Sequence, residues 1–337
     1  LFMLGISLPI EGRAATFSNA LFAGLRLAIE EHNQANPLRP VKLVFASSGT
    51  DPAEAVRQLA RQGADAVFGP LMSADAVAAG EAAEDERIPL FVPLATEAEV
   101  SEGRQYVLQA NSSFPMRGTL MARHAVRSLR MNRLGVVYET GTYSEVQARA
   151  FIDEAKKLDA EIRLDVPIDT DRGWYDLRNR IDTDTLTYID AVYVPATGDD
   201  ARQEIREFLK VIAQNAELRV LGNGEWHDLG REEATSRHKA VYPRDFYVRD
   251  TPENTTFSRR YRNLTARDPN RLAYAGYDAG RFLSNALANS EERDLRRALQ
   301  AVGRYDGLGS RFDFSAGNDN QAVFYLRYED GKVVLAD

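Results

Sequence analysis

The sequence contains no cysteine among its 337 residues. This absence excludes disulfide bonds, thiolate catalysis and cysteine-ligated metals, and it is compatible with an oxidising or a reducing compartment. The four histidines lie on separate segments without the spacing of metal ligands, so we expect no metal site. They are His32, His124, His227 and His238.

Motifs of catalysis and cofactor binding are also missing. The sequence has no Gly-x-Ser-x-Gly nucleophile elbow and no Walker-type phosphate loop. Gly222-Asn223-Gly224 begins like a dinucleotide loop, but His227 stands where the third glycine is needed. We therefore expect no enzyme, no catalytic residue and no cofactor.

Long apolar runs are absent too, since none approaches the ~18 residues that cross a bilayer. The formal net charge of −8 argues against a general nucleic-acid or membrane-surface role. The chain starts directly with a strand-like segment, 2–7, so we expect that any signal peptide was removed or not included.

Short apolar runs alternate with amphipathic helical segments through most of the chain. This rhythm predicts parallel sheets covered by helices on both faces, and the length suits two lobes. The alternation of strands and helices begins again after Asn111-Ser112-Ser113-Phe114-Pro115, which we interpret as a connecting segment. We predict an α/β fold with two doubly wound parallel-sheet lobes, closed by a hairpin of strands 312–314 and 323–328.

Two hydroxyl residues follow neighbouring strand-like runs. Ser73 follows strand 65–68, and Thr96 follows strand 88–92. The carboxyl ends of parallel strands meet at one sheet edge, where ligands bind, and the first N–H groups of a following helix attract anions. Each hydroxyl is also a favoured helix cap, Thr96 with Glu99 in a capping box. The pattern favours capture of a small carboxylate over turnover.

The order and spacing of several segments resemble one known family across nearly the whole chain. These segments are Gly5-Ile6-Ser7-Leu8-Pro9 with Gly12, the helix 24–31 with Asn33, Asp51-Pro52 with Ala55, Gly69-Pro70 to Ser73, Glu84-Asp85, Ile88-Pro89, Pro93 to Thr96, Ala275-Gly276-Tyr277-Asp278-Ala279, and Gly309 to Phe314 with Gly331-Lys332-Val333. The sequence resembles the type I periplasmic binding proteins of the leucine/isoleucine/valine-binding type.

The resemblance implies two lobes joined by a three-crossover hinge that closes on a ligand in the cleft between them. The implied lobes are 1–113 with 249–312, and 114–248 with 313–337. It also implies that Ser73 and Thr96 donate to a ligand carboxylate, while the carbonyl of Leu94, beside Ala95, accepts from its ammonium. Such charge-assisted bonds contribute roughly 1.5 to 3 kcal/mol each.

The second lobe departs from the family pattern at two positions. Thr197 stands where an aromatic residue is expected, and Glu225 lies one position late for an expected acid. Tyr143 matches an aromatic residue at the cleft mouth, as Phe17 does in the first lobe. Trp226 is a further candidate, although a core position is the more common place for tryptophan.

These observations favour a periplasmic or extracytoplasmic solute-binding protein that delivers an amino acid or similar carboxylate to a membrane permease or receptor partner, as in ABC-type uptake. The alternative is a regulatory or scaffolding module of the cell envelope that has lost its ligand, motivated by Thr197 and Glu225. For Asp278, beside Tyr277 near a helix start, a structural role is the stronger expectation.

Overall fold

The computed structural model describes residues 1–9, 11–12, 14–46, 51–169, 173–215, 217–229, 233–289 and 295–336. The chain forms two compact units: unit 1 is Leu1–Ser113 with Asp245–Val323, and unit 2 is Phe114–Arg244 with Phe324–Asp337. The chain therefore passes from one unit to the other at three points in the sequence.

Two of these points differ from the boundaries expected from the sequence, which followed residues 248 and 312. Phe246 and Val248 pack against a small apolar cluster in unit 1 that includes Phe257. Phe314 lies with Phe312 in the main core of unit 1. The segments 245–248 and 313–323 therefore belong to unit 1.

Unit 1 is built on a five-stranded sheet in which every pairing is parallel, in the order β2-β1-β3-β4-β5. The strands are β1 (Phe2–Ile6), β2 (Val41–Phe45), β3 (Ala66–Phe68), β4 (Leu90–Val92) and β5 (Val107–Gln109), with a separate antiparallel pair, β11 (Tyr305–Asp306) and β12 (Arg311–Phe312). The helices are α1 (Ala15–Ala35), α2 (Pro52–Arg61), α3 (Ser73–Glu86), η1 (Ala98–Val100), α9 (Pro252–Thr265), α10 (Arg271–Asn289) and α11 (Leu295–Ala301).

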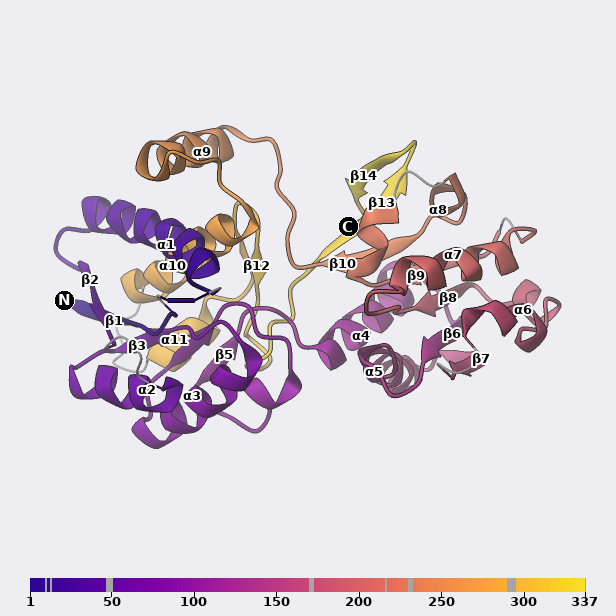
Figure 1. Cartoon of the computed structure of the whole chain (residues 1–337), viewed down its shortest axis with the longest axis horizontal. Coiled ribbons are helices and arrows are strands. Elements are labelled where there is room, and N and C mark those ends of the chain that lie inside the picture. Colours follow the sequence, from indigo (N-terminus) through magenta and orange to yellow (C-terminus); the bar gives the residue numbers. More distant parts are fainter. Residues whose placement is uncertain are drawn as a thin grey trace. The chain divides into compact units, whose positions relative to one another are not determined.

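Successive side chains of these strands enter two different cores, because they point to opposite faces of the sheet. Phe68 and Phe91 join the core formed with α1 and α10. Val67 and Leu90, their neighbours in the chain, join the core formed with α2 and α3. Figure 1 shows the two helix layers on opposite sides of this sheet.

Unit 2 is built on a seven-stranded sheet with the order β14-β13-β10-β9-β8-β6-β7. Its strands are β6 (Arg133–Glu139), β7 (Glu161–Ile168), β8 (Ala191–Val194), β9 (Arg219–Gly222), β10 (Val241–Arg244), β13 (Phe324–Glu329) and β14 (Lys332–Leu335). Its helices are α4 (Phe114–Arg123), η2 (His124–Ser128), α5 (Tyr143–Lys157), η3 (Trp174–Asp176), α6 (Leu177–Arg180), η4 (Thr185–Tyr188), α7 (Ala201–Ile212), η5 (Gly224–Leu229) and α8 (Glu233–Arg237).

The sheet of unit 2 is parallel from β7 to β10, and β13 and β14 extend it in antiparallel fashion. The expected hairpin between 312–314 and 323–328 is wrong. β12 pairs with β11, whereas β13 pairs with β10 and β14. Adjacent apolar runs suggested a local hairpin, but the actual partners are set by the separate cores of the two units.

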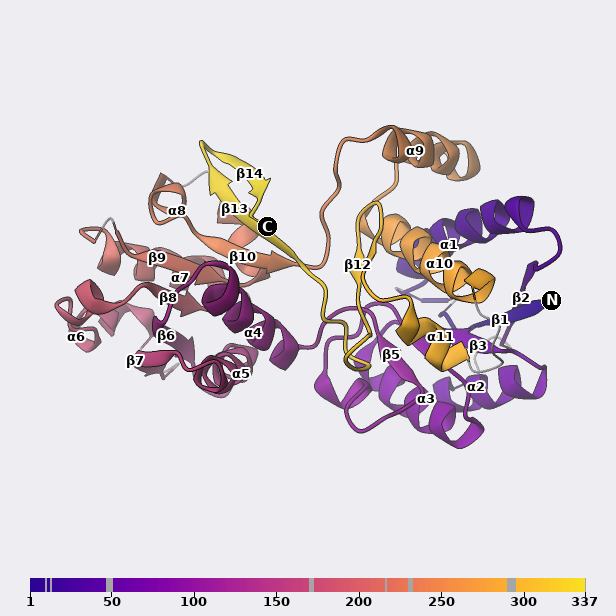
Figure 2. The ribbon, with the colours of Figure 1, turned by 180° about the vertical axis from the view of Figure 1, so that it is seen from behind.

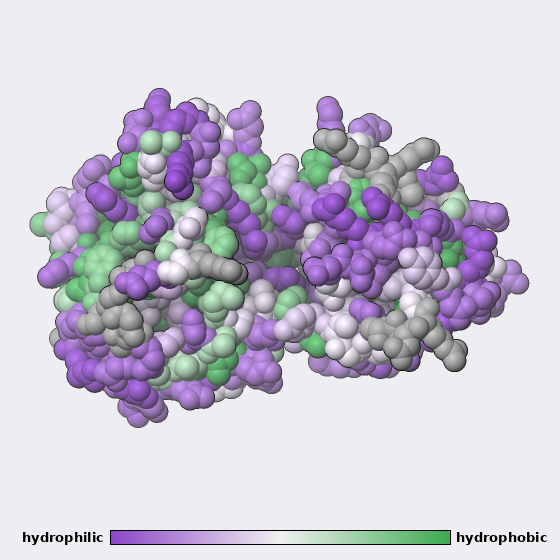
Figure 3. Space-filling view, viewed as in Figure 1, coloured by the Kyte–Doolittle hydropathy of each residue, from purple (hydrophilic) through white to green (hydrophobic). Residues whose placement is uncertain are grey.

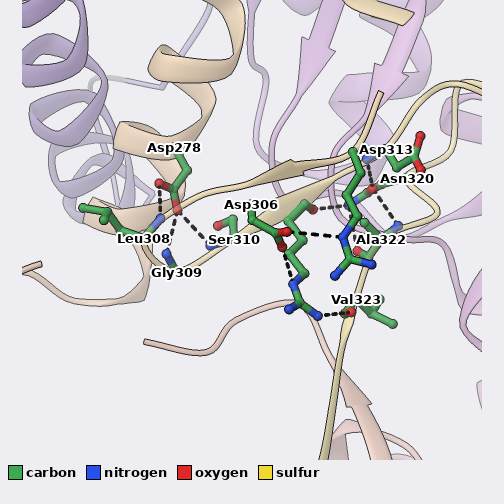
Figure 4. Close-up of polar contacts among 11 residues, drawn as sticks. Asp278, Asp306, Leu308, Gly309, Ser310, Asp313, Asn320, Ala322 and Val323 are labelled. Carbon is green, nitrogen blue, oxygen red and sulfur yellow. Dashed lines mark hydrogen bonds and ion pairs between the residues drawn. The ribbon is translucent and has the colours of Figure 1, made fainter. Parts of the chain in front are cut away.

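Two buried polar side chains hold the irregular end of unit 1 together (Figure 4). Asp278 accepts from the backbone N–H groups of Leu308, Gly309 and Ser310 at 2.8–2.9 Å. Its structural role is thus confirmed. Burial raises the pKa of Asp278 to about 6, and the three N–H donors act in the opposite direction.

Asn320 is the second of these side chains and is 2% exposed. Its amide nitrogen donates to the carbonyls of Ala110, Arg311 and Ala322, and its oxygen accepts from the N–H groups of Asp313 and Ala322. One side chain therefore ties the segment after β5 to the segment after β12. Both lead towards points where the chain leaves unit 1.

On the face shown in Figure 3, hydrophilic side chains predominate over the surface of unit 2. Among the described residues of both units, no helix combines the length and the apolar character required to cross a bilayer.

The packing of α1 on α10 depends on two glycines, and Figures 1 and 2 show the two helices side by side. A Cβ atom on Gly24 would lie 2.0 Å from the carbonyl oxygen of Ala273, and one on Gly276 would lie 1.8 Å from that of Leu21. Both neighbours are backbone atoms, so neither can rotate away. Only glycine permits this approach.

We expect Gly276→Ala to lower the free energy of unfolding by about 3 kcal/mol, because the added methyl must separate the helices. Gly280→Ala should cost less, since the nearest atom there, Cβ of Ala28, is farther away, at 2.7 Å. Asn19→Ala, at an exposed position of α1, is the control. Urea denaturation measures all three, and equal midpoints for Gly276→Ala and the control would contradict the close packing.

Candidate functional site

Ser73 and Thr96 meet at one edge of the unit 1 sheet, as predicted. β3 and β4 are neighbours in parallel, so the loops that follow them leave the sheet on the same side. The backbone N–H of Thr96 donates to Oγ of Ser73 at 3.3 Å. Both side chains are partly exposed.

The hydrogen bond between them determines which donors remain for a ligand. Ser73 accepts from Thr96, so its own O–H proton remains to be donated. Ser73 is the first residue of α3, and the N–H groups of a first helical turn have no partner within the helix. A hydroxyl donor and a helix N-terminus together suit an anionic oxygen.

Neither residue caps a helix through its side chain. The cap position of α3 is Met72, and that of η1 is Glu97, each without a side-chain cap. The capping box expected for Thr96 is therefore wrong. A tertiary contact from β5 holds this segment instead.

That contact comes from Gln109, which is fully buried. Its amide nitrogen donates to the carbonyls of Ala95 and Glu97 at 3.0 and 3.1 Å, and its oxygen accepts from the Ser101 hydroxyl at 2.8 Å. Ala95, a predicted site residue, is buried, and its carbonyl already has this partner. Ala95 thus supports the loop that carries Thr96.

Leu94 also has a protein partner, since its carbonyl accepts from the Asn111 amide at 3.0 Å. A carbonyl has two lone pairs, so one site remains for a further donor. The cavity beside Leu94 and Asn111 has a volume of about 20 Å³. This is room for one water molecule and too little for an amino acid.

Phe17 lies in the first turn of α1, which follows β1, the strand beside β3. Its side chain is 53% exposed. The order of strands therefore places Phe17 after the same sheet edge as Ser73. An exposed phenylalanine at such a place is available for contact with a ligand or a partner.

In unit 2, the structure brings Tyr143 and Thr197 together along one hollow of about 1110 Å³. Tyr143 begins α5 behind its cap residue Thr142, whose hydroxyl accepts from the Ser144 N–H. The ring of Tyr143 is 45% exposed and stacks on Phe114 with 4.1 Å between ring centres. This stacking fixes an aromatic surface at the hollow.

Asn223 joins two loops at the same sheet edge, those following β8 and β9. Its amide nitrogen donates to the carbonyl of Ala196 at 2.7 Å, and its oxygen accepts from the N–H of Glu225 at 3.3 Å. Glu225 is exposed at the start of η5. Partial desolvation, followed by the charge of Asp228, raises the pKa of Glu225.

Trp226 is not available to a ligand. It is completely buried, and its indole N–H donates to the carbonyl of Val194 at 2.9 Å. The ring lies directly over Gly222, where a Cβ atom would be 2.3 Å away. The prediction of Trp226 as a site residue is therefore wrong, because the missing side chain of Gly222 opens a place for the indole in the core.

Among the residues that the structure describes, no group of three or more histidine, aspartate or glutamate side chains could hold a metal ion. The supporting amides Gln109, Asn111 and Asn223 were missed by sequence reasoning. Each follows or ends an apolar strand, and a polar amide at that position is a signal that points to the sheet edge.

A sequence model of the periplasmic binding protein family matches residues 3–328. The Leu/Ile/Val-binding protein of Citrobacter freundii is 28% identical over 159 residues, which are 45% of this chain and 43% of that protein. The matched part thus spans less than half of that relative.

Solved structures resemble the whole chain. One, from Rhodospirillum rubrum and assigned to a branched-chain amino acid ABC transporter, has a TM-score of 0.78, 22% identity and 99% coverage of both chains. Another is an ABC transporter substrate-binding protein from Desulfitobacterium hafniense in complex with Leu, with a TM-score of 0.65, 20% identity and 99% coverage of both chains. The expected fold is confirmed.

We expect Gln109→Leu to destabilise the protein by about 3 kcal/mol, because the carbonyls of Ala95 and Glu97 lose their buried donor. Hydrogen exchange should also accelerate at the amides of residues 95–97, where the loop is no longer held. Gln105→Leu, the same change at an exposed position, is the matched control. Unchanged exchange at residues 95–97 would show that Gln109 does not hold the loop.

Proposed function

The chain belongs to the periplasmic binding protein family, and from this premise we propose that it captures an amino acid or a similar small carboxylate for an ABC-type uptake system. Membership of a binding-protein family confirms the expectation of binding without catalysis. We further propose an extracytoplasmic location and a membrane permease as partner.

The observation that carries the proposal is the hydrogen bond between Ser73 and Thr96 at the carboxyl edge of the unit 1 sheet. It leaves the Ser73 hydroxyl proton and the first N–H groups of α3 as donors in one place. Thr96 carries a second hydroxyl at this edge. We propose that these donors bind the carboxylate of the solute and that the carbonyl of Leu94 accepts from its ammonium.

The passage of the chain between two units at three points suits a hinge. We propose that the solute binds the closed form of this hinge more tightly than the open form, so that binding shifts the population towards closure. The structural relative from Desulfitobacterium hafniense, solved with Leu, supports an amino acid as the class of solute.

Calorimetry with a panel of amino acids and small monocarboxylates tests this function. We expect at least one compound to bind with micromolar affinity, and Ser73→Ala to weaken that binding about tenfold or more through the loss of a charge-assisted hydrogen bond. Thr96→Val should weaken it similarly. Ser315→Ala, at an exposed turn of unit 1, should leave the affinity unchanged.

Unchanged affinity in both Ser73→Ala and Thr96→Val would refute the carboxylate site. If no compound of the panel binds, the alternative of a regulatory or scaffolding module in the cell envelope becomes the better explanation.

A further inference from the structure

The hollow of unit 2 beside Tyr143 is lined by an excess of negative charge. Six carboxylates and one guanidinium line it among the described residues, namely Glu139, Glu145, Asp153, Asp199, Asp200, Glu204 and Arg149. Arg149 already donates to Glu145 at 3.3 Å, with its guanidinium over the ring of Tyr138. The charge of Arg149 is therefore already paired with a carboxylate of the hollow.

Glu204 differs from the other acids of the hollow because it is buried. It lies on α7, is only 6% exposed, and its Oε2 atom has no hydrogen-bond partner. A buried carboxylate with one unpaired oxygen costs free energy that the protein would recover if a cation or a donor were placed beside that oxygen. Such a group points to a ligand that supplies this cation.

The groups around Glu204 make a cation beside its carboxylate more favourable. The groups that act on it are Glu139 from β6, Asp200 before α7, and the indole of Trp174 from η3. The pKa of Glu204 is raised to about 7, mainly by burial and also by the charges of Glu139 and Asp200, while the nearby indole of Trp174 acts in the opposite direction. Burial and Asp200 also raise the pKa of Glu139.

The sequence position of Glu204 agrees with a site rather than a solvated helix face. Glu204 shares the buried side of α7 with Ala201, Ile205 and Phe208. An acid on the apolar side of an amphipathic helix is costly unless it has a function or a partner.

We infer that this hollow of unit 2 binds a cationic group of the solute, an alkyl ammonium or a guanidinium, through Glu204 and Glu139. The exposed ring of Tyr143 lines the same hollow and favours a cation over its face. A metal ion does not suit the site, because the described residues offer no cluster of metal ligands. The inference rests on the proposed function and names the solute class, a basic amino acid or a related amine.

Calorimetry with arginine, citrulline and agmatine tests the inference. Arginine and citrulline share their carboxylate and nearly their shape, and only arginine carries a side-chain charge. We expect arginine to bind about tenfold or more tightly than citrulline. Glu204→Gln and Glu139→Gln should each make the affinities for arginine and citrulline more nearly equal. Glu207→Gln, three residues further along α7 and bound to Lys210, is the matched control.

Agmatine lacks the carboxylate and so separates this inference from the proposed function. Agmatine binding that Glu204→Gln abolishes, combined with no effect of Ser73→Ala or Thr96→Val on arginine binding, would leave the cation site intact and refute the carboxylate site. Equal binding of arginine and citrulline, failure of both arginine and agmatine to bind, or an unchanged preference in both glutamine variants would overturn the inference.

The preference for arginine should also depend on pH. The pKa of Glu204 near 7 in the free protein means that its carboxyl becomes neutral as the pH falls through this value. The arginine-to-citrulline ratio should therefore decrease several-fold between pH 8 and pH 5.5. In Glu204→Gln this pH dependence should be reduced, and an equal pH dependence in that variant would contradict the role of Glu204.

Discussion

The parallel pairing of β3 with β4 is the constraint on which the candidate site depends. Phe68 is opposite Phe91 in this pairing, and both rings lie in the same core, stacked 6.0 Å apart. A shift of one residue would turn one ring out of that core, so burial fixes the register. The register in turn places Ser73 and Thr96 within one hydrogen bond.

Buried amide side chains hold the loops in place through hydrogen bonds to their backbone groups. Gln109 fixes the segment after β4, Asn320 joins the ends of two segments of unit 1, and Asn223 joins two loops of unit 2. Each satisfies backbone groups that no sheet or helix can reach. Loops held in this way keep their polar atoms in place before a ligand binds. Less conformational entropy is therefore lost on binding.

The two parallel sheets and the proximity of Ser73 to Thr96 could be predicted from the sequence, because periodicity and strand order are local signals. It failed where the partner is distant in the chain. The place of Trp226 depends on Val194, and the pairing of β13 depends on β10. Glu204 was overlooked, although its position among the apolar residues of α7 was visible in the helical spacing.

The distribution of tryptophan has a practical consequence. The chain has two tryptophans, Trp174 and Trp226, and both are buried in unit 2, while unit 1 has only tyrosine and phenylalanine as aromatic residues. Intrinsic fluorescence excited at the indole band therefore follows the unfolding of unit 2 alone. Compared with circular dichroism, which reports on both units, it separates the melting of one unit from that of the other without any label.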